Sequence, residues 1–136
     1  VGEDEFGQSK AKVYQARYDN LRHGLSCMPK YIDSLSAEEL EGVTFAFVCV
    51  DKGSARAGIF DALIAKGIPF IDVGMGLNRK QGALNGLVRM TYFSAQDAKR
   101  IRDMQLVDLS VRPDDIYRSN IQIAELNALN ACLAVI

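Results

Sequence analysis

The chain has 136 residues, 49% of them hydrophobic, and a formal net charge of −1 at pH 7. A chain of this length can bury one hydrophobic core, which predicts a single domain or part of one. Lys and Arg are scattered among Asp and Glu, which disfavours nucleic-acid binding, and no apolar run approaches the roughly 20 residues that span a bilayer. The composition therefore favours a cytoplasmic protein that binds neither nucleic acid nor a membrane.

Cysteine and histidine, the usual zinc ligands, are sparse in this sequence. Cys27, Cys49 and Cys132 are far apart and each lies in an apolar stretch, a pattern that favours reduced thiols in the core over a disulfide framework. No Cys-x-x-Cys pair is present, and His23 is the single histidine. The sequence therefore predicts no zinc site.

Residues 10–25 are predicted to form the first helix. Ser9 can cap it, and apolar side chains recur at spacings of three and four residues, at Ala11, Tyr14, Tyr18, Leu21 and Leu25. Lys10 lies in the first turn, where a cation opposes the helix dipole but suits a phosphate bound by the free N–H groups. The pattern alone favours the alternative, a solvated surface lysine.

Two weaker signals follow this helix. Residues 27–33 are predicted to hold a short edge strand that Pro29 interrupts. Ser36 and Glu39 form a capping box, which predicts a short helix before the central strand.

The central stretch, residues 44–76, is predicted to form a strand, a helix and a second strand. Residues 44–50 are an apolar run without polar alternation, which indicates a parallel strand buried on both faces. Ser54 can cap the helix, Gly67 is its natural C-terminal stop, and its apolar side is expected to consist of Ala55, Ile59, Phe60 and Leu63. Residues 70–73 are predicted to form the second strand, which should end in a turn at Gly74 and Gly76.

The candidate chemistry lies at the end of the first of these strands. Ligands of such units bind beyond the carboxyl ends of the strands, which places Asp51 and Gly74 on the predicted ligand edge. A carboxylate there can hold Mg²⁺, while Lys10 can neutralise the phosphates that the ion bridges. A cap of the turn at residues 53–54 explains Asp51 equally well. Arg56 can brace Asp51 or face an anionic substrate, but an ordinary surface arginine is slightly favoured.

Beyond Gly76, residues 77–82 are predicted to be a polar loop. Residues 84–93 are predicted to form a half-exposed antiparallel strand, in which Val88, Met90 and Tyr92 alternate with Arg89 and Thr91. A short surface helix is expected at residues 97–104. After a break at Pro113, a last helix from Tyr117 is predicted to present an apolar stripe of Ile123, Leu126, Leu129 or Asn130, Leu133 and Ile136.

Several segments of the chain resemble the ThiF/MoeB/HesA family, the bacterial relatives of ubiquitin-activating enzymes. Gly7-Gln-Ser-Lys10 followed by Ala11 looks like the family's G-x-x-K-A segment, and the stretch from Asp51 to Pro69 looks like its strand-Asp-helix segment. Residues 74–76, 86–90 and 117–131 are also similar to the family. The resemblance covers nearly the whole chain, and residues 51–69 are its most specific part.

The resemblance implies a Rossmann-like ThiF-type α/β fold with a mixed parallel and antiparallel sheet and flanking helices. The family's N-terminal nucleotide-binding strands and Gly-rich loop would precede Val1, so residues 1–136 are expected to be a single partial domain, the C-terminal part of the fold. Such enzymes use ATP and Mg²⁺ to adenylate the C-terminal carboxylate of a ubiquitin-like or sulfur-carrier protein. By this resemblance Lys10 and Asp51 are catalytic, Asp51 holds the Mg²⁺, and nucleotide or substrate is bound by Lys10, Arg56, Gly74 and Gly76.

The expected function is therefore that of a fragment of an adenylyltransferase, inactive alone and without a tightly bound cofactor. Its expected partners are the ubiquitin-like or sulfur-carrier protein and a second copy of the chain, in a homodimer or a looser self-association, since a sheet that lacks its leading strands exposes an edge and apolar surface. The alternative is a non-catalytic Rossmann-like binding or regulatory module, either a pseudoenzyme or a nicotinamide-binding relative.

Overall fold

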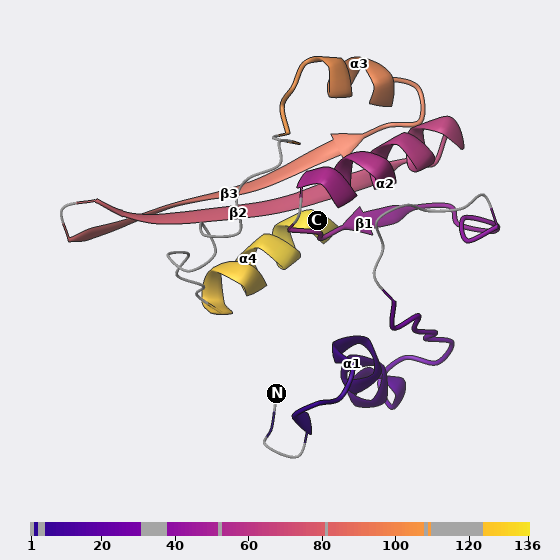
Figure 1. Cartoon of the computed structure of the whole chain (residues 1–136), viewed down its shortest axis with the longest axis vertical. Coiled ribbons are helices and arrows are strands. Elements are labelled where there is room, and N and C mark those ends of the chain that lie inside the picture. Colours follow the sequence, from indigo (N-terminus) through magenta and orange to yellow (C-terminus); the bar gives the residue numbers. More distant parts are fainter. Residues whose placement is uncertain are drawn as a thin grey trace. The chain divides into compact units, whose positions relative to one another are not determined.

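The structure is a computed structural model that describes residues 2, 5–30, 38–51, 53–80, 82–107, 109 and 124–136. The chain divides into two compact units, Val1–Tyr31 and Ile32–Ile136. Figure 1 labels the helices and strands of both units. Helix α1 belongs to the first unit, and the described strands belong to the second.

The first unit is built on helix α1 (Lys10–Asp19). Ser9 stands at the predicted N-cap position with an extended backbone, but its side chain makes no cap hydrogen bond. The helix ends earlier than predicted, and at its end the N–H of Leu21 bonds to the carbonyl of Tyr18, three residues back, in a tighter turn than that of an α-helix.

The predicted apolar stripe of α1 is wrong, because the buried residue of the helix is Val13 while Tyr14 and Tyr18 are exposed. Polar contacts fix the helix instead. The Arg17 side chain donates a hydrogen bond of 2.9 Å to Glu5, and the Gln15 side chain reaches the carbonyl of residue 25 at 2.8 Å.

Residues 27–30 form no strand, contrary to the prediction. The N–H of Lys30 bonds to the carbonyl of Met28, which bends the backbone out of an extended conformation. The rest of the predicted edge strand and Ser36 of the capping box lie outside the described residues.

The second unit contains a three-stranded mixed sheet in the order β1-β2-β3. Strand β1 (Ala46–Val48) runs parallel to β2 (Phe70–Lys80), and helix α2 (Gly53–Ala65) connects them. Strand β3 (Ala83–Phe93) pairs antiparallel with β2 along the full length of both strands. These elements confirm the α/β class and the mixed sheet with flanking helices.

Helix α2 ends as the sequence predicts. Gly67 has a φ of +64°, and its N–H bonds to the carbonyl of Ile64 at 3.1 Å. The N–H of Ile68 bonds to the carbonyl of Leu63 at 3.0 Å, which completes the paired contacts of a Schellman motif. The start differs from the prediction, since the helix begins at Gly53 and Ser54 therefore lies inside its first turn instead of capping it.

Strand β2 is longer than predicted. The predictions of a turn at Gly74 and Gly76 and of a loop at residues 77–82 are therefore wrong. The strand continues to Lys80, and the hairpin turns at Gly82, whose φ is +86°. Continuous pairing with β3 overrides the local turn preference of the two glycines. The predicted antiparallel strand at residues 84–93 is confirmed as β3.

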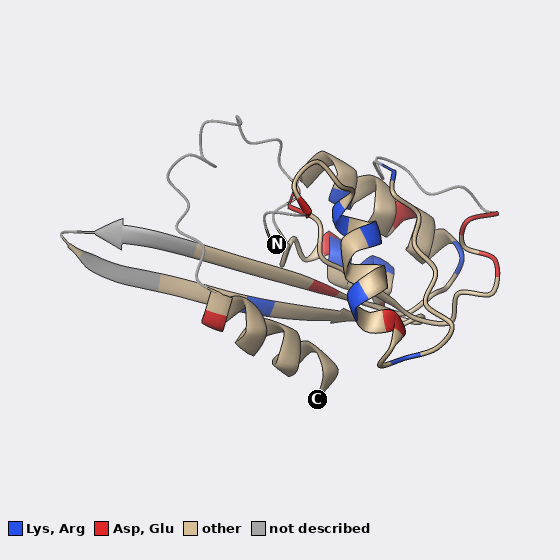
Figure 2. Cartoon of the chain, turned by 90° about the horizontal axis from the view of Figure 1, so that it is seen from below, with Lys and Arg blue, Asp and Glu red and all other residues tan. Residues whose placement is uncertain are grey.

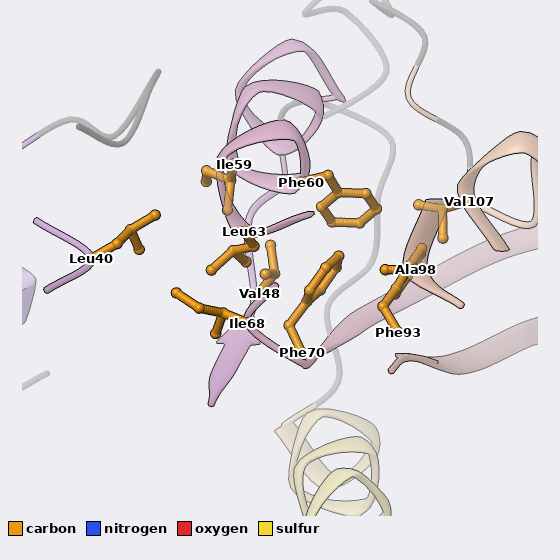
Figure 3. Packing of buried hydrophobic residues seen from close by; sticks show 10 residues of the cluster. All are labelled: Leu40, Val48, Ile59, Phe60, Leu63, Ile68, Phe70, Phe93, Ala98 and Val107. Atoms are coloured by element: carbon orange, nitrogen blue, oxygen red, sulfur yellow. The ribbon is translucent and has the colours of Figure 1, made fainter. Parts of the chain in front are cut away.

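The core lies between α2 and one face of the sheet (Figure 3). Phe70 and Phe93 stack with ring centroids 4.4 Å apart, and Phe60 from α2 packs on both at 4.8 and 4.9 Å. The predicted apolar side of α2 is confirmed for Ile59, Phe60 and Leu63, which are buried, while Ala55 is half-buried. The other buried members of the cluster are Leu40, Val48, Ile68, Ala98 and Val107.

Helix α4 (Ala124–Val135) packs against β2 and β3, on the face of the sheet opposite to α2 (Figures 1 and 3). Phe45, just before β1, and Phe47, within it, remain 38% and 51% exposed. The prediction that residues 44–50 are buried on both faces is therefore wrong. Helix α2 covers one face, and α4 lies over the two neighbouring strands.

The predicted apolar stripe of α4 is wrong in part. Asn130, the alternative to Leu129, is buried together with Ala134, whereas Leu129 and Leu133 are 48% and 40% exposed. Ile123 lies outside the described residues. The side-chain amide of Asn130 donates a hydrogen bond to the carbonyl of Gly74, and this contact turns the Asn130 side toward the sheet.

The cysteines are free, as predicted, but their expected burial in the core is wrong. Cys49 and Cys132 are exposed, and Cys27 is half-buried. Helix α3 (Ala98–Asp103) confirms the short helix expected at residues 97–104. None of the described helices combines the length and the apolar character that crossing a membrane requires.

Candidate functional site

Asp51 lies in the short connection between the end of β1 and the start of α2. Its side chain is exposed. Strand β1 is parallel to β2, so this connection is at the carboxyl end of the parallel pair, the edge at which ligands of α/β proteins bind.

Arg56 braces the backbone next to Asp51. One terminal nitrogen of its guanidinium donates a hydrogen bond to the carbonyl of Val50, and its Nε lies 3.1 Å from Oδ1 of Asp72. The Arg56 side chain is 11% exposed, so the interpretation of Arg56 as an ordinary surface arginine is wrong. A guanidinium suits this position because its planar fork can serve two acceptors at once.

Asp72, which the sequence analysis did not single out, is completely buried in β2. Arg89 from β3 donates a hydrogen bond of 2.7 Å to its Oδ2, and we call Arg56, Asp72 and Arg89 the Asp72 cluster. The Arg56 contact is close but not aligned as a hydrogen bond, since Arg56 Nε and Asp72 Oδ1 are both buried without a hydrogen-bond partner. That contact is therefore an ion pair whose attraction is mainly electrostatic.

The electrostatics of the Asp72 cluster combine two opposed effects. Burial raises the pKa of Asp72, because the carboxylate loses its hydration, while Arg56 and Arg89 pull the pKa down. Burial is the larger effect. A lone buried carboxylate would be costly, and two guanidiniums are what allow it to remain in the sheet.

Gly74 is the residue that makes room for the cluster. It pairs with Arg89 in the register of β2 and β3, and a Cβ at Gly74 would lie 2.6 Å from the terminal nitrogen of Arg89 that also binds Asp72. Around Gly76, by contrast, a Cβ would meet nothing within 4 Å. The two glycines, predicted to act together in a ligand turn, have different surroundings within one strand.

Asn130 is a second residue whose polar role the sequence analysis missed. Its side chain is 4% exposed and reaches the carbonyl of Gly74 at 3.1 Å, while its Oδ1 has no hydrogen-bond partner in the described part of the chain. A polar residue inside an apolar run was the available signal for both Asp72 and Asn130, because buried polar groups require partners.

Lys10 stands in the first turn of α1, as predicted, and is exposed. It belongs to the first unit, whereas Asp51 belongs to the second. That the two side chains meet at one phosphate site stays a prediction.

Asp51 fits one mode of magnesium binding. Among the described residues, no group of three or more His, Cys, Asp or Glu side chains could hold a metal ion. Mg²⁺ commonly uses one or two protein carboxylates together with phosphates and water. A single exposed carboxylate therefore fits an ion that arrives with a nucleotide, but not an ion held by protein ligands alone.

The fold and these residues define an α/β protein with a carboxylate beyond the carboxyl end of a parallel strand. Comparisons of the chain with protein-family models, with curated proteins and with solved structures find no match.

Proposed function

We propose that the full-length protein is an ATP-dependent adenylyltransferase that activates the C-terminal carboxylate of a ubiquitin-like or sulfur-carrier protein. The observation that carries the proposal is the exposed carboxylate of Asp51, directly beyond the parallel strand β1 and before α2. The Rossmann-like ThiF-type assignment is part of this proposal. It is supported by the parallel β1-α2-β2 unit and by the family-like segment at residues 51–69.

In this proposal Asp51 holds the Mg²⁺ that accompanies ATP, and the bound ion would neutralise charge on the phosphate oxygens. Lys10, at the start of α1, contributes a cation beside the free N–H groups of that turn, which suits a phosphate. Arg56 supports the site through the carbonyl of Val50, since its guanidinium is engaged there and at Asp72.

We also propose that the protein acts in the cytoplasm and associates with a second copy or with its modifier protein through apolar surface. Phe45 packs against Phe47 and Tyr92, and all three aromatic side chains are partly exposed. Helix α4 carries a single charged residue, Glu125, so most of its exposed surface is uncharged (Figure 2). Exposed apolar surface of this kind supports a protein partner.

The proposal is tested by ATP–pyrophosphate exchange with the full-length protein and candidate ubiquitin-like proteins. Asp51→Ala is expected to lower the exchange rate roughly a hundredfold or more, since a lost contact to charge-developing oxygens typically costs a few kcal/mol. Lys10→Ala should act on the same step. Asp97→Ala is the matched control, because Asp97 is also an exposed aspartate next to the start of a helix in the second unit.

Circular dichroism of each variant checks that the fold is kept. A folded Asp51→Ala protein that exchanges pyrophosphate as fast as the wild type would show that Asp51 is not the anchor of the metal.

A further inference from the structure

We propose that Asp72 is a positioning residue for Asp51, and that it acts through Arg56 and the carbonyl of Val50. The inference rests on the proposed function, because it concerns the carboxylate assigned there to Mg²⁺. It adds Asp72, a completely buried residue of β2 that pairs in register with Val48 at the end of β1, to the set that determines metal binding.

The first step of the argument is the double attachment of Arg56. On one side its Nε lies 3.1 Å from the buried carboxylate of Asp72, and on the other side its guanidinium donates to the carbonyl of Val50. The side chain is 11% exposed, so neither contact is exchanged freely with water. A planar guanidinium attached at two points links β2, α2 and the end of β1 in one geometry.

The second step leads from Val50 to Asp51. The carbonyl group of Val50 lies in one rigid peptide plane with the backbone nitrogen and the Cα of Asp51. A hydrogen bond that holds the oxygen of this plane therefore restricts where Cα of Asp51 lies and which way its side chain can leave the backbone. Asp51 follows β1 outside regular secondary structure, and among the described residues the hydrogen bond from Arg56 directly restrains the peptide that precedes it.

The third step separates positioning from stability. Asp72 has a second partner, Arg89, whose recorded contacts are Asp72, Thr91 and the carbonyl of Leu106. Loss of either arginine leaves a buried carboxylate short of a cation and should destabilise the fold. Arg56 contacts the peptide that precedes Asp51, whereas the hydrogen bonds of Arg89 go to other groups.

The experiment measures binding of Mn²⁺ with ATP to the full-length protein by electron paramagnetic resonance, with Mn²⁺ in place of Mg²⁺. Arg56→Gln and Asp72→Asn are expected to weaken Mn²⁺·ATP binding about tenfold or more, as is typical when a residue that orients a metal ligand is removed. Arg56→Lys should weaken it too, because an ammonium cannot hold both acceptors in the same plane. Arg89→Gln is the matched control and should lose stability while keeping the affinity for Mn²⁺·ATP.

A double-mutant cycle identifies the route of the effect. If Asp72 acts through Asp51, Asp72→Asn should cause no further loss of Mn²⁺·ATP affinity in a protein that already carries Asp51→Ala. Equal losses with and without the Asp51→Ala change would overturn the inference, and so would an Arg89→Gln loss as large as that of Arg56→Gln. The Arg56 variants, which keep the buried carboxylate, decide the question if the Asp72→Asn protein does not fold.

The proposed function fails in a different way from this inference. If Asp51→Ala binds Mn²⁺·ATP as tightly as the wild type, the metal role of Asp51 is wrong and the positioning of that residue falls with it. If Asp51→Ala loses binding while Arg56→Gln and Asp72→Asn keep it, the metal role stands and the positioning role of Asp72 is overturned.

Discussion

Asp72 and Gly74 depend on each other, although they belong to one strand and do not bond directly. Both face the side of the sheet that carries Arg89, and the terminal nitrogen of Arg89 reaches Asp72 through the space where Gly74 lacks a side chain. Glycine weakens a strand because it gives the unfolded backbone more conformational freedom to lose and has no side chain that can pack against its neighbours. Here the absent Cβ permits a buried ion pair, which explains a glycine in the middle of a continuous ladder.

Gly74→Ala is therefore expected to destabilise the protein by about 1–3 kcal/mol, the cost of losing a charged hydrogen bond. Gly76→Ala, in the same strand with open space around it, should be neutral or stabilise by up to about 1 kcal/mol. Urea unfolding followed by circular dichroism measures both values. In an Arg89→Ala background the penalty of Gly74→Ala should disappear. If the penalty persists there, the cause is something other than Arg89.

The residues missed by the sequence analysis were missed for a definite reason. Asp51 and Arg56 could be singled out from local sequence. Asp51 directly follows the apolar run of a predicted strand, and Arg56 lies near the start of the helix predicted after it. Asp72 and Arg89 meet only through the register of β2 and β3. The predicted turn at Gly74 placed the end of the strand before that register, so the pairing of Asp72 with Arg89 could not be anticipated.

Among the elements, the C-terminal end of α2 was predictable and that of β2 was not. The stop of α2 at Gly67 is a local signal, since a left-handed glycine closes the last turn with two backbone hydrogen bonds. The length of β2 is decided by its partner β3, which pairs with it as far as the turn at Gly82. The buried side of α4 depended in the same way on a distant contact, that of Asn130 with Gly74.

The unequal burial of α2 and α4 gives a prediction for the same substitution in each helix. Leu63 in α2 is 1% exposed in the core, whereas Leu129 in α4 is 48% exposed. Leu63→Ala should lower the free energy of unfolding by about 2–5 kcal/mol, from lost burial and the cavity left behind. Leu129→Ala should change it by about 0.5 kcal/mol or less, as exposed positions usually do.

Equilibrium unfolding of the two variants against the wild type provides the measurement. The loss at Leu129 should be the smaller of the two at every protein concentration tested. A loss at Leu129 comparable to that at Leu63 would mean that the outer side of α4 is covered in solution, as association of two copies through this helix would cause.

For the whole molecule, the Asp72 cluster predicts how stability depends on pH. Burial raises the pKa of Asp72 above its ordinary value of 3.8, so the folded chain holds a proton there at pH values where the unfolded chain has released it. Stability falls with rising pH wherever the folded state binds more protons. The contribution of Asp72 to the stability of the fold is thus fully present below the pKa that Asp72 has in the unfolded chain. It is lost as the pH rises through the pKa of Asp72 in the folded chain.

Glu5 in the first unit affects the pH dependence of stability in the opposite direction. Its hydrogen bonds with Arg17 lower its pKa, so its contribution is present at higher pH and is lost as the pH falls. A pH profile of the wild type alone would mix the two effects. A comparison with Asp72→Asn isolates the buried group, because Glu5 titrates equally in both proteins.

Urea unfolding of the wild type and of Asp72→Asn, from about pH 3 to pH 7, measures this difference. Circular dichroism is the suitable signal, since the chain contains no Trp. The free energy of unfolding of the wild type minus that of Asp72→Asn should be greatest at the acid end and should decline as the pH rises. A difference that grows with pH would mean that Arg56 and Arg89 outweigh burial and lower the pKa of Asp72 in the folded chain. The sign of the slope thus determines whether desolvation or ion pairing dominates at the centre of this sheet.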